Sequence, residues 1–408
     1  MTQVSLAKKT GAALIITGTC VGAGMLVLPL VTAACGFIIA SILLVVIYLL
    51  MLSTAFLIME VNLSMPDGTN FSSMAKNTLG PIGQLFAWLS FLLLMYALTA
   101  AYTSQGASLL GLWLSHYLSI NLPPSVDSLI FILAFGAFIY SGTFAVENLN
   151  KILISVKILS FIALTVVIMP HISTERILQK TPNINLFWIT LPLLITSFGY
   201  HNILPSVRTY LKSNKKSLRN VILIGGTIPL IFYLLWESIT LGTIPLYGEY
   251  SFQHIVNHGN NVTGLIKVYN DYYHIPAINT FTTIFTNVAI TTSFLGVTLS
   301  LFNFNQDTYR LKTKNHFHKI IAFLITYTPP FLFAVYYPDG FIMALGYASI
   351  FVAIILISMP AMMAWVVREK NGSNTLFSKF YLILIMLSGF MMILLQVATQ
   401  FDWLPMFK

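Results

Sequence analysis

Long apolar runs separated by short polar connections make up most of the chain. A helix needs about 20 mostly apolar residues to cross the hydrocarbon core of a bilayer. By this criterion the pattern predicts eleven membrane-spanning helices, at residues 11–34, 37–60, 84–117, 128–145, 149–170, 187–210, 220–243, 278–304, 318–336, 340–366 and 378–400. The third run is long enough to be tilted, and a short turn around Glu147–Asn150 separates the fourth from the fifth. We therefore expect an all-α integral membrane protein that forms one transmembrane domain over residues 1–408.

The composition supports a membrane location. The 408 residues contain 21 Lys and Arg and 12 Asp and Glu, so that charged side chains are 8% of the chain and hydrophobic ones 57%. Soluble domains carry about 25% charged residues. This excludes a cytosolic enzyme, a secreted disulfide scaffold and a disordered tail protein. Cys20 and Cys35 both fall in the first apolar segment. If that segment is helical, they lie roughly 22 Å apart at 1.5 Å per residue, which is too far for a disulfide.

The basic residues predict the orientation. With the N-terminus in the cytoplasm, sixteen Lys and Arg fall on the cytoplasmic side of the eleven spans, and only Arg176, Lys180, Lys267 and Lys408 fall outside. Such a positive-inside bias places the C-terminus on the outer side of the membrane. Because the excess of basic residues follows the topology and forms no single face, we expect no nucleic-acid partner.

Two predicted helices are interrupted at matching places. The first contains three glycines and Pro29 within residues 18–29, and the sixth contains Gly199 and Pro205 within residues 197–205. Both residue types weaken a helix interior. Aligning the two prolines relates the first and sixth spans, which run in opposite directions. The pattern predicts two inverted halves, at 11–170 and 187–366, followed by an extra helix at 378–400.

Interrupted helices in corresponding halves are typical of transporter sites. A break in mid-membrane exposes unpaired N–H groups at one new helix end and unpaired carbonyls at the other. A ligand with an anion and a cation satisfies both ends, and a free amino acid is the smallest common molecule of this kind. The alternative is that Gly18 and Gly22 form a small-residue packing face and that the prolines only kink the helices.

Five segments carry a family resemblance. GTCVGAGMLVLPL, MYALTAAY, TSFGYHNILPS, TSFLGVTLSLF and GFIMALGYA, at 18–30, 95–102, 196–206, 292–302 and 340–348, resemble the bacterial aromatic amino acid permeases, and among these more the tyrosine-specific than the tryptophan-specific ones. The resemblance covers nearly the whole chain. It implies the amino acid–polyamine–organocation group, a LeuT-like fold of five plus five helices with one extra helix, and proton-coupled uptake of aromatic amino acids across the bacterial inner membrane.

The interrupted helices give the first candidate site residues. We expect the carboxylate of the amino acid to meet the backbone N–H groups that follow Gly22, on Ala23, Gly24 and Met25. We expect its ammonium to meet carbonyls near Thr19, Cys20, Ser197 and Phe198.

Two groups of side chains are candidates for the walls of the site. In LeuT-like folds the third helix flanks the substrate, and Tyr96, Thr99 and Thr103 share one of its faces, while Tyr102 and Gln105 turn away. A polar seam between helices is the alternative. In the sixth helix, Phe198, Tyr200 and His201, around Gly199, are candidates for contact with an aromatic ring, or else they pack inside the protein.

Lys157 is the candidate for proton coupling. It lies about nine residues into the predicted fifth helix, near mid-depth, where an ionised lysine costs about 2.5–3.5 kcal/mol or more. The resemblance implies that such a lysine occupies the place of a sodium ion in proton-coupled relatives, close to the hydroxyls of Thr292 and Ser293. A side chain that reaches the interface is the alternative.

The remaining polar residues give weaker signals. Glu237, about one and a half turns from the outer end of its helix, is a candidate for an outer gate or a proton relay. His254 and His258 have i,i+4 spacing in the outer loop but lack further ligands, so we expect neither a metal nor a cofactor.

We therefore expect a secondary active symporter of protons and an aromatic amino acid, with tyrosine favoured. The alternative is a tryptophan-preferring or serine/threonine-type carrier of the same fold, with sodium as the second candidate for the coupling ion, although Lys157 argues against sodium. A membrane-embedded enzyme is not expected, because no HExxH, GxSxG, Walker or CxxC motif is present. The expected partners are the amino acid, protons and the lipid bilayer, with no obligate protein partner.

Overall fold

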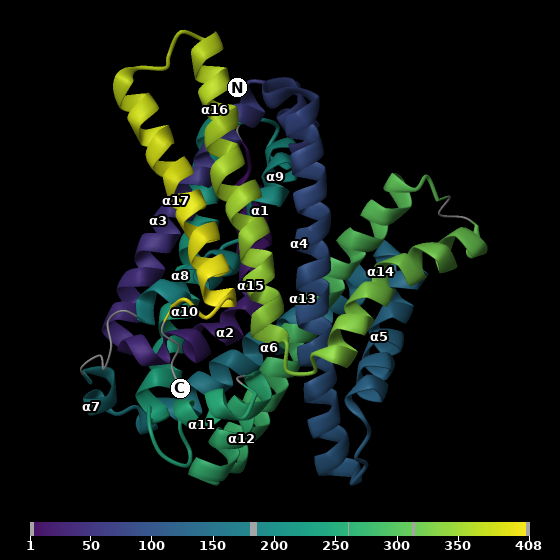
Figure 1. Ribbon diagram of the computed structural model, residues 1–408, viewed down its shortest axis with the longest axis vertical. Coiled ribbons are helices and arrows are strands. Elements are labelled where there is room, and N and C mark those ends of the chain that lie inside the picture. The colour runs from purple at the N-terminus through teal and green to yellow at the C-terminus, as the bar shows by residue number, and fades with distance from the viewer. Residues whose placement is uncertain (1–3, 180–185, 260, 312–314, 405–408) are drawn as a thin grey trace.

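The computed structural model describes residues 4–179, 186–259, 261–311 and 315–404, and the regular structure within these ranges is helical (Figure 1). The chain forms α1 Leu6–Cys20, α2 Ala23–Thr32, η1 Ala33–Cys35, α3 Gly36–Leu63, α4 Phe71–Leu118, α5 Pro124–Ser141, α6 Thr143–Ile168, η2 Met169–His171, α7 Thr174–Ile177, α8 Phe187–Ser197, η4 His201–Ile203 and α9 Leu204–Tyr210. It continues with α10 Lys215–Thr243, α11 Phe252–Asn257, α12 Val262–Tyr273, α13 Pro276–Thr308, α14 His316–Tyr336, α15 Phe341–Val352, η5 Ala353–Ser358, α16 Met359–Lys370 and α17 Leu376–Gln400.

Nine helical runs in the described ranges are long and apolar enough to cross a membrane. They are Ala23–Leu63, which joins α2 to α3, Phe71–Leu118, Pro124–Ser141, Thr143–His171, Lys215–Thr243, Pro276–Thr308, His316–Tyr336, Phe341–Lys370 and Leu376–Gln400. The interrupted pairs α1–α2 and α8–α9 do not form continuous runs, because the chain leaves the helical conformation after Cys20 and after Ser197.

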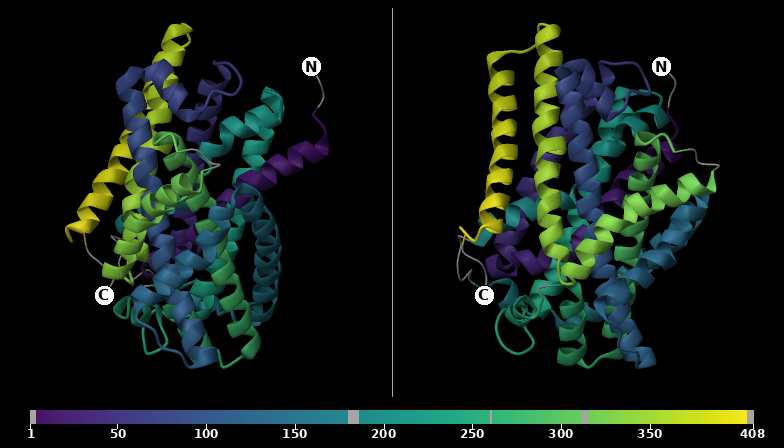
Figure 2. Two further views of the ribbon diagram at one scale, coloured as in Figure 1. Left: turned by 90° about the vertical axis from the view of Figure 1, so that its right-hand side faces the viewer. Right: turned by 45° about the vertical axis from the view of Figure 1, so that its right-hand side comes forward.

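The helices pack in two groups. In the first, α1, α2, α3, α8, α9 and α10 contact one another, with α10 against both α1 and α3. In the second, α4 is central and packs against α5, α13, α14 and α15, while α6 packs along α13. Helix α17 lies at one edge of the molecule and α5 and α14 at the opposite edge (Figure 2). The two interrupted helices therefore lie in one group and α4, α6 and α13 in the other.

The third and fifth predicted spans begin earlier than the hydrophobic pattern suggested. Helix α4 starts at Phe71, capped by the Asn70 side chain, and bends at Gly80, whose φ of 76° is left-handed. The predicted turn at Glu147–Asn150 is wrong. The chain turns at Gly142, with φ 113°, and Glu147 forms an i,i+4 ion pair of 3.0 Å with Lys151 inside α6. The polar residues belong to an exposed helical turn, and the glycine supplies the turn.

The two ends of the bundle differ. Helix α4 begins and α9 ends at the end that lies at the top of Figure 1, which we call the inner end. Helices α11 and α12 cover the opposite end, which we call the outer end. Both are short helices within the connection from α10 to α13, and Ser251 and Asn261 cap their first turns. The longest connection between spans is thus a folded cover.

Candidate functional site

The first helix break is held by side chains from two distant helices. Lys157 on α6 donates a hydrogen bond of 2.7 Å from Nζ to the carbonyl oxygen of Val21, which follows α1, and one of 3.3 Å to Thr292 Oγ1 on α13. Its side chain is only 4% exposed. The carbonyls at a helix end have no partner within the helix, so the lysine satisfies one of them inside the protein.

Ser293, the next residue of α13, holds the other side of the break. Its Oγ accepts a hydrogen bond of 2.8 Å from the backbone N–H of Ala23, the first residue of α2. A Cβ atom added to Gly22 would lie 2.3 Å from this oxygen. Glycine is needed at this position because the serine approaches the backbone too closely for any side chain. The structure thus brings Lys157, Thr292 and Ser293 together at Val21–Ala23.

The second helix break lies against the first. Helix α8 ends at Ser197, and the Ser197 hydroxyl donates a hydrogen bond of 3.2 Å to the carbonyl oxygen of Gly24. Tyr233 on α10 connects both breaks. Its hydroxyl lies 2.8 Å from the carbonyl oxygen of Cys20 and 2.5 Å from that of Ser197. These are the carbonyls at the ends of α1 and α8, where we expected the ammonium group. Sequence patterns gave no sign of Tyr233, because α10 is uninterrupted.

A cavity of about 350 Å³ connects the breaks to the inner end of the bundle. Thr19, Thr196, Gly199 and Asn202 line it at the breaks, and Asn70–Ser72 line it where α4 begins. Its remaining walls are mostly apolar and include five aromatic side chains, Phe71, Trp88, Phe91, Tyr102 and Phe304. A cavity of this size, with apolar walls and a few polar groups, is typical of a site for a small organic molecule.

The face of α4 that lines this cavity is not the one predicted. Met95, Leu98 and Tyr102 line it, whereas Tyr96 turns toward α14 and donates a hydrogen bond of 2.9 Å to the carbonyl oxygen of Ile325. Thr99 donates to the carbonyl of Met95, and Thr103 is fully buried. The residues at 95, 98 and 102 share one helical face, and packing rather than polarity decides which face meets the cavity.

The aromatic residues of the second break pack inside the protein. Phe198, Tyr200 and His201 are at most 1% exposed. The His201 Nε2 atom lies 2.8 Å from Thr54 Oγ1 on α3, and the rings of His201 and Tyr200 are 5.0 Å apart. Phe198 meets the ring of Tyr233 edge-on at 5.0 Å. In this conformation Gly199 and Asn202 are the residues between α8 and α9 that line the cavity.

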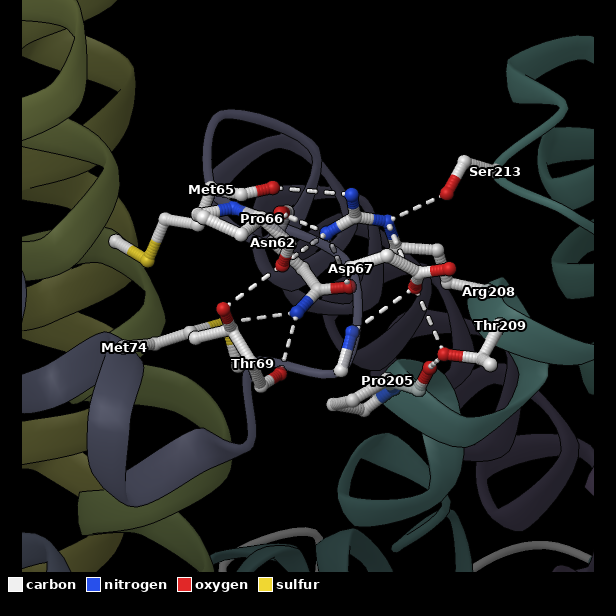
Figure 3. A network of polar contacts seen from close by, with 11 residues as sticks. Asn62, Met65, Pro66, Asp67, Thr69, Met74, Pro205, Arg208, Thr209 and Ser213 are labelled. Carbon is white, nitrogen blue, oxygen red and sulfur yellow. Dashed lines mark hydrogen bonds and ion pairs between the residues drawn. The ribbon is translucent and has the colours of Figure 1, made fainter.

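Arg208 organises the inner mouth of the cavity (Figure 3). It lies on α9, is 6% exposed, and donates to the carbonyl oxygens of Asn62, Met65 and Pro66, which end α3 and begin the connection to α4. It also donates a hydrogen bond of 3.0 Å to Ser213 Oγ. One guanidinium therefore ties α9 to the segment that leads to Asn70–Ser72. In the sequence Arg208 stood out only as one of many basic residues.

Known proteins resemble this chain over nearly its whole length. The profile of the tryptophan/tyrosine permease family matches residues 6–396. The tryptophan-specific transport protein of Pseudomonas aeruginosa is 32% identical over 406 residues, which cover 98% of this chain and 96% of that protein. The tyrosine-specific transport system 2 of Haemophilus influenzae is 32% identical over 407 residues, 98% of each chain. Glutamine transporter 2 of Aliivibrio fischeri is 30% identical over 369 residues, 89% of this chain and 90% of that protein.

Proposed function

Because the chain belongs to the tryptophan/tyrosine permease family, we propose that it takes up an aromatic amino acid, with tyrosine favoured, together with protons by alternating access. Its relatives are named as transport proteins and permeases, so the chain is a multi-pass membrane transporter and not an enzyme.

The proposed architecture has eleven spans, with α1–α2 and α8–α9 each crossing the membrane once as an interrupted helix. In the LeuT-like arrangement, residues 11–170 and 187–366 form the inverted halves and 378–400 the extra helix. Two features support this. Each half opens with an interrupted helix, and the two breaks meet through Ser197, Gly24 and Tyr233.

The proposed orientation has the N-terminus in the cytoplasm and the C-terminus in the periplasm of a bacterial inner membrane. The distribution of Lys and Arg supports it. The inner end then faces the cytoplasm. The cavity extends to this end, where Asn70–Ser72 line it, which supports an inward-facing conformation.

The aromatic cavity that reaches both helix breaks is the observation that carries the substrate proposal. The amino acid lies with its polar groups at the breaks and its ring among the apolar walls. Its carboxylate faces the N–H groups of Ala23, Gly24 and Met25, once Ala23 leaves Ser293 Oγ and Met25 leaves the carbonyl of Gly22, to which they are bonded in this conformation. Its ammonium faces the carbonyls of Cys20 and Ser197. Among the tyrosines of α4, Tyr102 lines this cavity and Tyr96 does not.

Proton coupling rests on Lys157. Its ammonium is buried and holds the carbonyl of Val21, so its charge stabilises the break in its present shape. Loss of that proton removes the charge-assisted hydrogen bond, which is about twice as strong as a neutral one, and frees the end of α1 to move. Gain and loss of a proton at Nζ thereby change the conformational equilibrium of the site.

Uptake into proteoliposomes tests this function. Labelled tyrosine, tryptophan, phenylalanine, serine and glutamine are offered under an inward proton gradient and, separately, under a sodium gradient. We expect accumulation of aromatic amino acids with the proton gradient alone. Accumulation driven only by sodium contradicts the coupling, and transport of serine or glutamine without any aromatic amino acid contradicts the substrate.

Lys157→Met tests the coupling residue. We expect it to abolish proton-driven accumulation, because the methionine side chain carries no proton. Lys151→Met is the matched control, since Lys151 lies on the same helix but is exposed and paired with Glu147. Accumulation by Lys157→Met at the level of the control contradicts the assignment.

A further inference from the structure

We propose that Glu237 and Thr32 form a second proton-binding site, distinct from Lys157. This site holds a proton when the outer end of the transporter is closed and releases it when that end opens. The proposal rests on the transport function above. It assigns a ligand, the proton, to a buried carboxyl group that the coupling at Lys157 does not use.

The pair is enclosed by protein. Glu237 on α10 and Thr32, the last residue of α2, are both 0% exposed. Thr32 Oγ1 lies 3.0 Å and 2.9 Å from the two carboxyl oxygens of Glu237. The same Oγ1 lies 2.8 Å from the carbonyl oxygen of Leu28. Three acceptor atoms thus surround one hydroxyl group.

The number of hydrogens available between Glu237 and Thr32 indicates whether the carboxyl group is protonated or ionised. A threonine hydroxyl has one proton to donate, and an ionised carboxylate has none. If Glu237 were ionised, this single proton would be shared among the two carboxylate oxygens and the carbonyl of Leu28. If Glu237 carries a proton, it donates to Thr32 Oγ1, and Thr32 donates onward to Leu28, so that each hydrogen serves one acceptor. The neutral acid therefore fits the geometry.

Among the residues that the structure describes, no cation lies within ion-pair distance of Glu237. The titratable or charged groups of the described residues that face the outer half of α10 are Cys20, Cys35, Lys157, His171, Glu175, Arg176, Tyr269 and Tyr273. Cys35 lies within electrostatic range of the carboxyl, Lys157 is engaged at the first break, and Arg176 bonds to Tyr272 and to the carbonyl of Thr243. An unpaired charge buried in a membrane span is costly, which favours the protonated form.

The outer end provides the route for the proton. A small recess there is lined by Ala33, Gly36, Arg176 and Leu241. Ala33 follows Thr32 directly, and Leu241 lies one helical turn beyond Glu237. The inner cavity has neither Thr32 nor Glu237 in its lining. Movement of the end of α2 away from α10 therefore exposes the carboxyl to outer water first, beside the guanidinium of Arg176.

The consequence is a link between external pH and conformation. When the outer end opens, Glu237 gives its proton to water at that face and becomes a carboxylate. When the end closes, the carboxylate takes one proton back from the same side. Lower external pH therefore favours the closed outer end, by up to about tenfold per pH unit for one proton. This proton returns to the side from which it came and is not transported.

Accessibility of Cys35 tests the proposal without requiring transport. Cys35 is fully buried beside the site at the outer end, so that a membrane-impermeant maleimide reaches it from outside only when that end opens. Labelling of the peptide that contains Cys35 is measured by mass spectrometry on right-side-out proteoliposomes over a range of external pH. Thiol reactivity itself rises with pH, so wild type is compared at each pH with Glu237→Gln, which resembles the protonated acid and cannot ionise.

We expect the ratio of wild-type to Glu237→Gln labelling to rise several-fold as external pH increases. We also expect a carboxylic acid C=O band in the infrared spectrum of the wild-type protein at neutral pH that is lost in Glu237→Gln. A labelling ratio that does not change with pH, or the absence of this band, overturns the proposal. Failure of the transport function appears separately, as wild-type protein that does not accumulate an aromatic amino acid under a proton gradient.

Discussion

Tyr233→Phe removes the hydroxyl that joins the two helix breaks and leaves the ring in place. The hydroxyl serves the carbonyl oxygens of Cys20 and Ser197, at 2.8 Å and 2.5 Å, and the side chain is 0% exposed. Both carbonyls end helices and lack partners within them. A buried acceptor that loses its donor costs about 1–3 kcal/mol. Since Tyr233→Phe leaves two carbonyls without this donor, we expect the free energy of unfolding of the ligand-free protein to fall by about 2–3 kcal/mol.

Tyr48→Phe is the matched control. Its hydroxyl bonds to Thr227 Oγ1 at 2.7 Å, and Thr227 already donates to the carbonyl of Leu223. Removal of the Tyr48 hydroxyl therefore strands no carbonyl, and we expect it to cost about 1 kcal/mol or less. Thermal unfolding of the purified protein, followed with a thiol-reactive dye that reports exposure of the buried Cys20 and Cys35, compares the two variants. Tyr233→Phe should have the lower midpoint.

Ligand binding gives the sharper readout. The ammonium of an amino acid donates three hydrogen bonds, and in the proposed arrangement it takes over the carbonyls of Cys20 and Ser197 from Tyr233. In Tyr233→Phe those carbonyls are vacant before binding, so the recovered 2–3 kcal/mol appears as tighter binding, by about 30-fold to 140-fold. The corresponding arylpropionate, which lacks the ammonium, should bind both forms equally.

Equilibrium binding of tyrosine, tryptophan and their arylpropionate analogues to wild type, Tyr233→Phe and Tyr48→Phe measures this difference. A decrease in affinity for the amino acid and for its analogue by the same factor in Tyr233→Phe would contradict the proposed exchange of hydrogen bonds. That result would mean that the hydroxyl only maintains the shape of the breaks.

Two further substitutions test the residues that support the site. Gly22→Ala places a Cβ atom 2.3 Å from Ser293 Oγ, so we expect it to displace the cap on Ala23, to cost about 1 kcal/mol or more of stability and to reduce uptake strongly. Gly18→Ala is the control and should retain uptake, because its Cβ meets nothing within 4 Å. Equal loss of uptake in both variants would exclude the close approach as the cause. Arg208→Ala leaves the carbonyls that end α3 without their donor, so we expect its thermal unfolding midpoint to lie several degrees below that of the control Arg219→Ala, in which an exposed arginine is replaced. Equal midpoints would show that the network at the inner mouth contributes little to stability.

The sequence located both helix breaks because their residues act locally. Glycine and proline weaken a helix wherever they stand, and α1–α2 and α8–α9 are interrupted at the predicted residues. Lys157 stood out for a similar reason, since a single cation in an apolar run is costly in any arrangement. Polar connections were harder to interpret. Glu147–Asn150 can form a turn or an exposed helical turn, and only the left-handed Gly142 fixed the choice.

By itself, then, the sequence determined the membrane class, the breaks and the residue that carries a charge inside the bundle, because hydrophobicity, backbone propensity and burial cost are properties of each segment. The tertiary structure alone decided which groups meet at the breaks. Tyr233 and Glu237 are separated from their partners on α1 and α2 by about 200 residues. Which face of α4 borders the cavity depends on how that helix is rotated against α14 and α13. Those choices follow from the packing of whole helices, which no local pattern encodes.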